Sequence, residues 1–466
     1  MTLLEQIAEK IVAIRYEDLP SEAVFWAKAA ILDTVGVTLA GSREDCTRIV
    51  EQVLAAESHG GDSLVFGSDR RVPPLVAALV NGTAAHALDF DDVSNSLGGH
   101  PSAPILPAIF ALADTKDCAE KPIGGHAFIA AYVAGFETET RIARGVHFHH
   151  YEKGWHPTAT LGVFGAAAAC CHLMQLSVAE TATALAIAAS FASGVKANFG
   201  TMTKPLHVGH TARNALFAAQ LAKIGFTANS GAMEHKQGFL EVFNGAGTYN
   251  AEAMLKDWGN PYDVVRPGPG FKQYPCCGST HPPLDALLAL RAAHAMPAEK
   301  VVRIDSWTHP RRLAHTNRPD PKSGLDAKFS VQYCLARAAL QGQIRLEDFE
   351  GNAYDDPAVR ALMTRIHAAP HPDAGTANEE ALGAEVRVTF DNGEVIAKKV
   401  SAALGRGPDN PMPAGALTAK FVNCASRALP PAAVARLQQM LETLETAPSV
   451  KAVVAAIATP GRLAAE

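Results

Sequence analysis

The sequence of 466 residues lacks the charge and composition of several large protein classes. Charged residues make up only 19% of it, and 41 Lys and Arg against 47 Asp and Glu give a net charge of −6. No block of basic residues occurs, so we expect no nucleic acid partner, because binding to phosphates needs a basic surface. The apolar share of 48% excludes a mainly disordered chain.

Patterns that hold metals, nucleotides or an activated serine are also missing. The eight cysteines show no C-x-x-C spacing, so the sequence predicts no zinc site and favours buried, reduced thiols. There is no G-x-G-x-x-G, G-x-x-x-x-G-K-[ST] or G-x-S-x-G motif. We therefore expect an enzyme without metal or cofactor, if it is an enzyme.

Targeting segments are not apparent. Residues 1–10 contain no basic segment followed by an apolar one, which argues against a secretory signal. The longest run without a charged residue, 154–179, is rich in Gly and Ala rather than Leu and Ile. We interpret it as a buried helix and not as a membrane span. The sequence therefore predicts a cytoplasmic protein with no membrane partner.

The apolar periodicity predicts a mainly α fold. Helices are expected at 22–39, 74–88, 104–112, 127–146, 178–191 and 211–224. After Pro261 a strand is predicted at 301–308 and a hairpin at 384–400 around an Asn-Gly turn, with helices at 282–295 and 327–341. The tail, 417–457, is again helical. We predict a large all-α domain from both chain ends (1–265 and 405–466) and a smaller α+β domain (266–404).

Three carboxylates cluster after the helix predicted at 74–88. Asp89, Asp91 and Asp92 lie within four positions, and a Gly-Gly-His-Pro loop with His100 follows. Clustered carboxylates shift each other's pKa, which suits acid/base chemistry. Their oxygens could also bind Mg²⁺, or the residues could be solvated caps of a helix end. The sequence leaves these three interpretations open.

Two further segments carry proton-transfer groups. His156 precedes Pro157 at the start of the buried Gly/Ala helix, and Tyr151 lies close before it. We expect the neighbouring His147, His149 and His150 to be exposed loop residues. Lys204 lies between Thr203 and Pro205 just before a predicted helix, where a lysine can serve as a base or bind a carboxylate.

Later segments offer groups that bind anions. Residues 271–281 include Lys272, Ser279 and His281 as possible donors, while Cys276 and Cys277 are interpreted as buried thiols. Arg318 could bind a substrate carboxylate through both guanidinium nitrogens, or pair with Asp326. All these segments combine His, Lys, Asp or Arg, and these residue types indicate cofactor-free acid/base chemistry on a polycarboxylate.

Four motifs, in this order, resemble the MmgE/PrpD family. They are D-F-D-D with H-P-S (89–92, 100–102), G-W-H-P-T (154–158), T-K-P-L-H (203–207) and D-A-K-F-S (326–330). Members include 2-methylcitrate dehydratase, cis-aconitate decarboxylase and iminodisuccinate epimerase. The resemblance implies a homodimer whose α+β domain is a lid over a metal-free active site between the domains. By motif, the matching site residues are Asp89, His100, His156, Lys204 and His281.

The resemblance also contains departures. Many relatives have Thr where this chain has Val93, and the decarboxylase branch has Tyr where this chain has His315. The loop after Asp92 lacks the Trp associated with 2-methylcitrate dehydratases. Tyr151 occupies the place of a catalytic tyrosine of the epimerase branch.

The shared step of the family is proton movement at a carbon next to a carboxylate. We expect Lys204 or His156 to move the proton, and Asp89 with His100 to orient the site or supply the acid. His281 and Arg318, with donors Lys272 and Ser279, would hold carboxylates of a di- or tricarboxylic acid. The sequence favours a hydro-lyase of the 2-methylcitrate dehydratase type. The alternatives are an epimerase of an amino-dicarboxylate using Tyr151 and Lys204, a cis-aconitate-type decarboxylase, or a non-catalytic polycarboxylate-binding protein.

Overall fold

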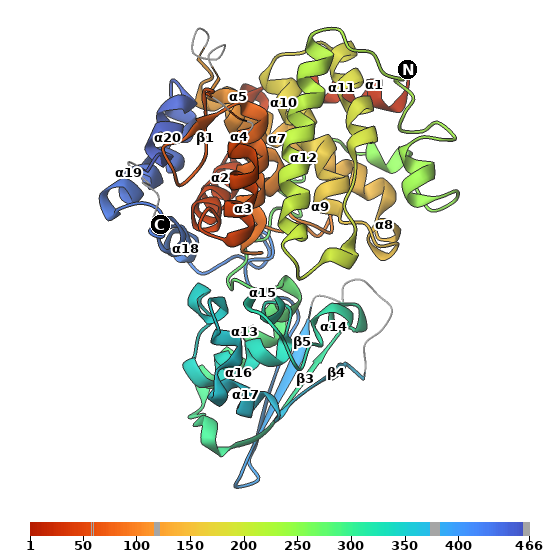
Figure 1. The fold of residues 1–466 in the computed structure, drawn as a ribbon. Helices are drawn as coiled ribbons and strands as arrows, with labels where there is room; N and C mark the ends of the chain where they lie inside the picture. Colours follow the sequence, from red (N-terminus) through yellow and green to blue (C-terminus); the bar gives the residue numbers. More distant parts are fainter. Residues whose placement is uncertain (57, 59, 116–121, 373–382, 460–466) are drawn as a thin grey trace. The chain divides into compact units, whose positions relative to one another are not determined.

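The computed structural model describes residues 1–56, 58, 60–115, 122–372 and 383–459. The fold is mainly α, as the sequence predicts, with 56% of residues in helices and 8% in strands. The chain divides into two compact units (Figure 1). One, here the helical unit, consists of Met1–Phe271 and Pro413–Glu466, and the other, the α+β unit, of Lys272–Met412.

The helical unit is built from long helices packed around one another. Its N-terminal segment contains α1 (Leu3–Val12), α2 (Ser21–Gly41), α3 (Asp45–Ala55), α4 (Pro74–Ala87), α5 (Ser102–Ala113), α7 (Gly125–Val146), α8 (His149–Glu152), α9 (Pro157–Thr160), α10 (Gly162–Leu173), α11 (Val178–Phe191) and α12 (Thr203–Lys223), with a small hairpin of β1 (Ser63–Leu64) and β2 (Arg71–Val72). The C-terminal segment adds α18 (Ala416–Ala425), α19 (Pro431–Glu442) and α20 (Val450–Ile457). Helix α18 packs on α2, so the chain end returns to this unit.

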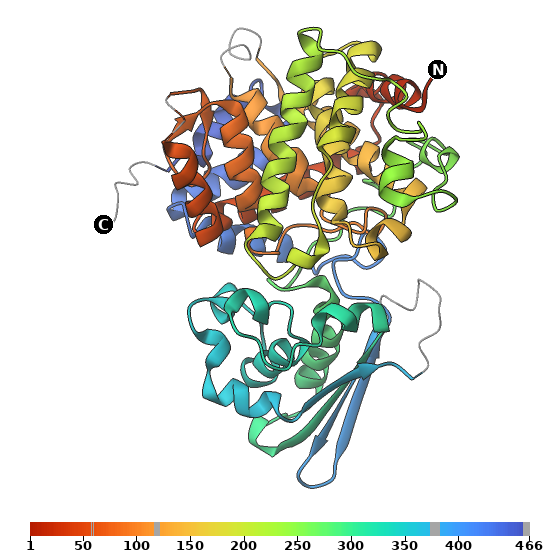
Figure 2. The ribbon, with the colours of Figure 1, turned by 45° about the vertical axis from the view of Figure 1, so that its right-hand side comes forward.

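Helices α4 and α12 pack side by side in this unit (Figures 1 and 2). Two glycines allow the approach: a Cβ on Gly82 would lie 2.8 Å from Gly209 Cα, and one on Gly209 would lie 2.3 Å from the Leu79 carbonyl oxygen. The two helices run antiparallel. The end of α4 therefore meets the beginning of α12, and this is where the candidate site lies.

The core of the helical unit is made of apolar and small side chains. Helix α2 is long and apolar enough to cross a membrane by length and composition, and 72% of its most apolar window is buried within the protein. The Gly/Ala-rich run forms α9 and α10, which are almost wholly buried, as predicted. The cysteines of the described residues are buried and form no disulfide with one another, as predicted; Cys118 lies outside those residues.

The α+β unit contains a four-stranded sheet in the order β4-β3-β5-β6. Strands β3 (Val301–Thr308), β5 (Ala384–Phe390) and β6 (Val395–Val400) pair antiparallel, and β4 (Ile366–Pro370) pairs parallel to β3. Helices α13 (His281–Ala293) and α16 (Val331–Gln341) pack together and contact the sheet. Shorter helices complete the unit: α14 (Pro310–Thr316), α15 (Gly324–Ala327) and α17 (Pro357–Met363).

Most predicted elements are present, with three corrections. The helix predicted from residue 211 begins at Thr203, so Lys204 lies in its first turn and not before it. The helix predicted at 327–341 begins at Val331, because Ser330 is its N-cap and accepts a hydrogen bond from the Tyr333 amide. Strand β4 was not predicted; its pairing with β3 needs a distant partner that local sequence does not reveal.

Candidate active site

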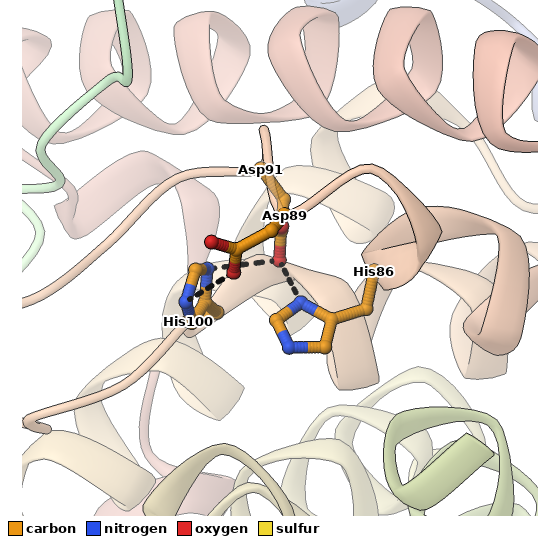
Figure 3. A group of neighbouring side chains, drawn as sticks. All are labelled: His86, Asp89, Asp91 and His100. Carbon is orange, nitrogen blue, oxygen red and sulfur yellow. Dashed lines mark hydrogen bonds and ion pairs between the residues drawn. The ribbon is translucent and has the colours of Figure 1, made fainter. Parts of the chain in front are cut away.

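The end of α4 turns back on itself and presents the first carboxylate. Leu88 caps the helix, and Asp89 follows with a φ of 52°, in the left-handed region. Asp adopts this conformation more readily than most residues because its short side chain can hydrogen-bond locally. The turn carries the chain away from α4. As a result, the side chains of Asp89, Asp91 and the helical His86 lie next to one another (Figure 3).

Asp91 joins two histidines. Its Oδ2 lies 2.8 Å from His86 Nδ1 and 3.1 Å from His100 Nδ1. On its other side, His100 Nε2 lies 3.6 Å from Asp89 Oδ1, so this ring bridges two carboxylates (Figure 3). His86, Asp89 and Asp91 are almost fully buried, and His100 is 9% exposed.

The protonation states of Asp91 and His86 follow from their surroundings. Burial acts to raise the pKa of the Asp91 carboxyl, but the facing His100 and His86 outweigh it and hold that pKa well below its ordinary value. Burial lowers the pKa of His86 to about 3, against the opposing effect of Asp91. At pH 7, His86 is therefore neutral and donates its Nδ1–H to an ionised Asp91.

Close backbone packing holds the His100 loop in place. The His100 amide donates to Thr158 Oγ1 at 3.0 Å. A Cβ on Gly99 would lie 2.8 Å from that hydroxyl and 2.9 Å from the Thr158 amide nitrogen, so only glycine fits here. Asp92 lies on the other side of the loop, where its Oδ2 accepts from Ser102 Oγ at 2.6 Å.

Lys204 comes from the first turn of α12 and pairs with Asp89. Its Nζ donates to Asp89 Oδ1, with only 7% of the lysine side chain and 3% of the aspartate side chain exposed. The lysine is thus buried within the helical unit and is not a surface residue. It places a cation beside the histidine and carboxylate array, at the point where α4 and α12 meet.

His156 is the second proton-transfer group brought to this place. It is the N-cap of α9, is 2% exposed, and its ring lies 5.6 Å from the His86 ring and 4.9 Å from the Phe199 ring, centroid to centroid. Lys204 Nζ lies 5.0 Å from that same Phe199 ring centroid. Burial, together with His86 and Lys204, lowers the pKa of His156 well below its ordinary value, so the ring is neutral at pH 7.

Tyr151 lies beside Lys196. Lys196 Nζ lies 3.3 Å from the Tyr151 ring centroid and donates to the Tyr151 carbonyl oxygen at 2.9 Å.

The expectation that His150 is an exposed loop residue is wrong. It is fully buried, with Nε2 2.7 Å from Thr160 Oγ1 and Nδ1 3.0 Å from Asn244 Oδ1. A histidine that satisfies both ring nitrogens in this way fixes α8 to α9.

The α+β unit holds the remaining predicted residues. Ser279 Oγ lies 3.1 Å from His315 Nε2, and His281 Nε2 lies 3.2 Å from the Cys276 carbonyl oxygen. Lys272 is buried, and a Cβ on Gly278 would lie 3.7 Å from its Cε.

Arg318 pairs with Asp326 through Nη1, which is the structural one of the two interpretations that the sequence offers. Its Nε also donates to the His315 carbonyl oxygen at 3.2 Å. The arginine thus ties the segment after α14 to α15.

The structure brings together residues that sequence reasoning did not select. His86 lies in the last turn of α4 and was not selected, and Asp91 was named only as a member of the acidic cluster, because a helix end and an acidic cluster look alike whether exposed or buried. His207, in the T-K-P-L-H motif, lies against His156. Arg406 donates to the Gly278 carbonyl oxygen at 3.0 Å, and its Pro/Gly-rich surroundings contain no signal that could have found it.

Four donors are close enough to hold a metal ion. Ligand atoms of His86, Asp89, Asp91 and His100 lie within 4.8 Å of one another. However, Asp91 Oδ2 is already hydrogen-bonded to His86 and lies 3.1 Å from His100 Nδ1, and the Lys204 ammonium contacts Asp89 Oδ1. A cation in this position would meet a second positive charge, so the donor set fits a proton-handling array better than a metal centre.

Comparison with known proteins gives the family. The chain matches the MmgE/PrpD N-terminal domain over residues 5–252 and the MmgE/PrpD C-terminal domain over residues 274–446. It is 30% identical over 454 residues to cis-aconitate decarboxylase of Homo sapiens, covering 95% of this chain and 92% of that protein. Cis-aconitate decarboxylase of Aspergillus terreus is 28% identical over 418 residues, covering 85% of this chain and 84% of its own length.

These relatives are lyases, and they do not favour the hydro-lyase that the sequence analysis preferred. They match the decarboxylase alternative, whereas neither the hydro-lyase nor the epimerase hypothesis gains support from them. The two domain models together span nearly the whole chain, and they show that it belongs to the MmgE/PrpD family.

Proposed function

We propose that this protein is a cofactor-independent lyase that removes CO₂ from cis-aconitate or a closely similar unsaturated tricarboxylate. The observation that carries the proposal is the buried array of Lys204, Asp89, His100 and Asp91 beside a neutral His156. It occurs in a chain that aligns over 95% of its length with a cis-aconitate decarboxylase.

The chemistry of decarboxylation explains why such an array is useful. When the C–C bond to a carboxylate breaks, its electron pair passes into the remaining unsaturated skeleton, and carbon then takes up one proton. Each turnover thus releases one CO₂ and consumes one proton. Negative charge develops next to a remaining carboxylate, where a fixed cation or hydrogen-bond donor in a dry site is most effective.

The residues divide these tasks by their charge. Lys204 supplies the cation that stabilises the developing negative charge, and its pairing with Asp89 holds it in place. His156, neutral and buried, is the proton donor to carbon. His100, between two carboxylates, orients Asp89 and is the alternative proton donor to His156 in this proposal. We propose that Lys272, Ser279 and His281 bind carboxylates of the substrate. Arg318 contributes indirectly, since it pairs with Asp326.

The test is a ¹H NMR assay in D₂O with cis-aconitate, citrate-like and amino-dicarboxylate acids, with CO₂ measured in the same tube. We expect equal amounts of CO₂ and a dicarboxylate carrying one deuterium from solvent. Lys204→Ala should reduce the rate at least about a hundredfold, the scale of a positioned acid/base or electrostatic group. Lys223→Ala, exposed at the other end of α12, is the matched control and should leave the rate unchanged.

Dehydration of a hydroxy-tricarboxylate is the second candidate, because Val93 and His315 replace the Thr and Tyr expected by resemblance. Those two positions favour a substrate that differs from cis-aconitate. New vinyl signals without CO₂ would establish the hydro-lyase and reject decarboxylation. Deuterium exchange without a new compound would indicate an epimerase, and binding without turnover a non-catalytic protein.

A further inference from the structure

Two histidine rings from different helices share one hydrogen bond at the candidate site. His156 Nδ1 and His207 Nδ1 are 3.2 Å apart, and the ring planes are inclined by 55°. His156 is 2% exposed, whereas His207, one turn after Lys204 on α12, is half-buried. Two ring nitrogens at this distance can bond only if one carries a proton and the other does not.

This contact links the tautomers of the two rings. If the shared proton is on His156 Nδ1, then His156 Nε2 carries a lone pair and is a base. If it is on His207 Nδ1, then His156 Nε2 carries the proton and is an acid. His156 Nε2 is buried and has no hydrogen-bond partner among the described residues, so it is the atom left for a reacting group.

Burial, more than the neighbouring groups, keeps both rings neutral. It lowers the pKa of His156, and the facing groups add to the effect: His86 from α4, Lys204 and His207 from α12, and His100 from its loop. Burial also lowers the pKa of His207, with Lys204 and His210 adding to the effect. Each ring then carries one proton. Because only one of the two facing Nδ1 atoms is protonated, the other ring carries its proton on Nε2.

The neighbouring backbone is shaped for this pair. Gly194 has a φ of +117°, and its carbonyl oxygen accepts from the His156 amide at 3.0 Å. A Cβ on Gly194 would lie 3.2 Å from His207 Nδ1 and 3.2 Å from Ala159 Cβ. The absence of a side chain at Gly194 therefore leaves the space in which the His207 ring meets His156.

We propose that His207 is a positioning residue that sets the tautomer of His156 and passes protons between it and solvent. The inference rests on the proposed decarboxylation and deepens it, since that reaction consumes one proton in a buried site per turnover. His156 gives its Nε2 proton to carbon and takes the Nδ1 proton of His207. His207 then regains a proton from water at Nε2, and the pair has changed tautomer. After product leaves, a water molecule in the emptied site protonates His156 Nε2, the His156 Nδ1 proton returns to His207 Nδ1, and His207 Nε2 releases its proton to solvent, which resets the pair.

The test combines imidazole ¹⁵N NMR with kinetics on the full-length protein. Wild-type His156, assigned by loss of its signals in His156→Gln, should show a single tautomer. His207→Ala should give mixed tautomers and a kcat at least about tenfold lower, with KM for cis-aconitate nearly unchanged. His207→Asn should restore one tautomer, because its amide reaches the Nδ1 position, but not kcat, because an amide cannot pass a proton on.

His235→Ala is the matched control, since His235 is an exposed histidine of the helical unit whose Nδ1 accepts from the Gln237 amide. It should leave the His156 signals and kcat unchanged. An unchanged His156 tautomer in His207→Ala, or wild-type kcat in His207→Asn, would overturn the inference. If His207→Ala does not fold, the Asn variant still decides. The NMR measurement needs no substrate, so failure of the wild-type protein to decarboxylate would reject the proposed function and not the histidine pair.

Discussion

The buried pair of Lys204 and Asp89 should be strongly coupled in stability as well as in function. Lys204→Met and Asp89→Asn each remove one charge and leave the other buried, since the side chains are only 7% and 3% exposed. The double variant removes both charges and keeps approximate side-chain volumes. The three variants and wild type thus form a double-mutant cycle.

The expected magnitude follows from the burial. Two unit charges about 4 Å apart attract by about 4 kcal/mol at an effective dielectric constant of about 20. Leaving one charge of a buried pair without the other costs about 3–5 kcal/mol. We therefore expect each single variant to lose about that much, and the double variant to lose about 2–3 kcal/mol less than the sum of the two.

Urea unfolding of the full chain at pH 7, followed by circular dichroism in the transition of the helical unit, measures these differences. The exposed pair of Arg15 and Asp18, which spans one helical turn, provides a matched cycle with Arg15→Met and Asp18→Asn. That control should show no measurable coupling because solvent screens exposed charges.

Additive losses for Lys204 and Asp89, within about 0.5 kcal/mol, would refute the reasoning, because independent sites add within that margin. Such a result would mean that the two side chains do not face each other in the folded protein. It would also remove the structural basis for Lys204 as the fixed cation of the site.

Three further predictions concern the packing and titration of the helical unit. Gly209→Ala should lower the midpoint of thermal unfolding and kcat together, because its Cβ would lie 2.3 Å from the Leu79 carbonyl oxygen; a fully active, equally stable variant would contradict the α4–α12 packing. His86 should show no imidazole titration by NMR between pH 7 and pH 4.5, because burial lowers its pKa to about 3; a midpoint near its ordinary value would be incompatible with its burial. Burial, reinforced by Asp92, raises the pKa of Glu139 well above its ordinary value, so its contribution to stability is present at low pH and lost as pH rises toward that raised pKa, by about 1.4 kcal/mol per pH unit. Glu139→Gln should therefore gain in stability relative to wild type between pH 5 and pH 8 in urea unfolding, and a constant difference would count against a titrating Glu139.

The sequence by itself determined the local structure of this protein. Strand 301–308 and the helices at 178–191 and 450–457 are where their periodicity predicts them, and the Asn392-Gly393 turn closes the hairpin of β5 and β6. These features depend on side-chain spacing, capping and turn residues within a few positions, which any short window contains. The motifs likewise revealed Asp89, His100, His156 and Lys204 as candidates.

Only the tertiary structure decided which of these groups act on one another. His86 and Asp91 became part of the site because burial turned a helix end and an acidic loop into a hydrogen-bonded array. Lys204 meets Asp89, 115 positions earlier, because Gly82 and Gly209 let α4 and α12 pack closely against each other. Such contacts depend on the packing of surfaces far apart in the chain, and that packing is a property of the folded core and not of any one segment.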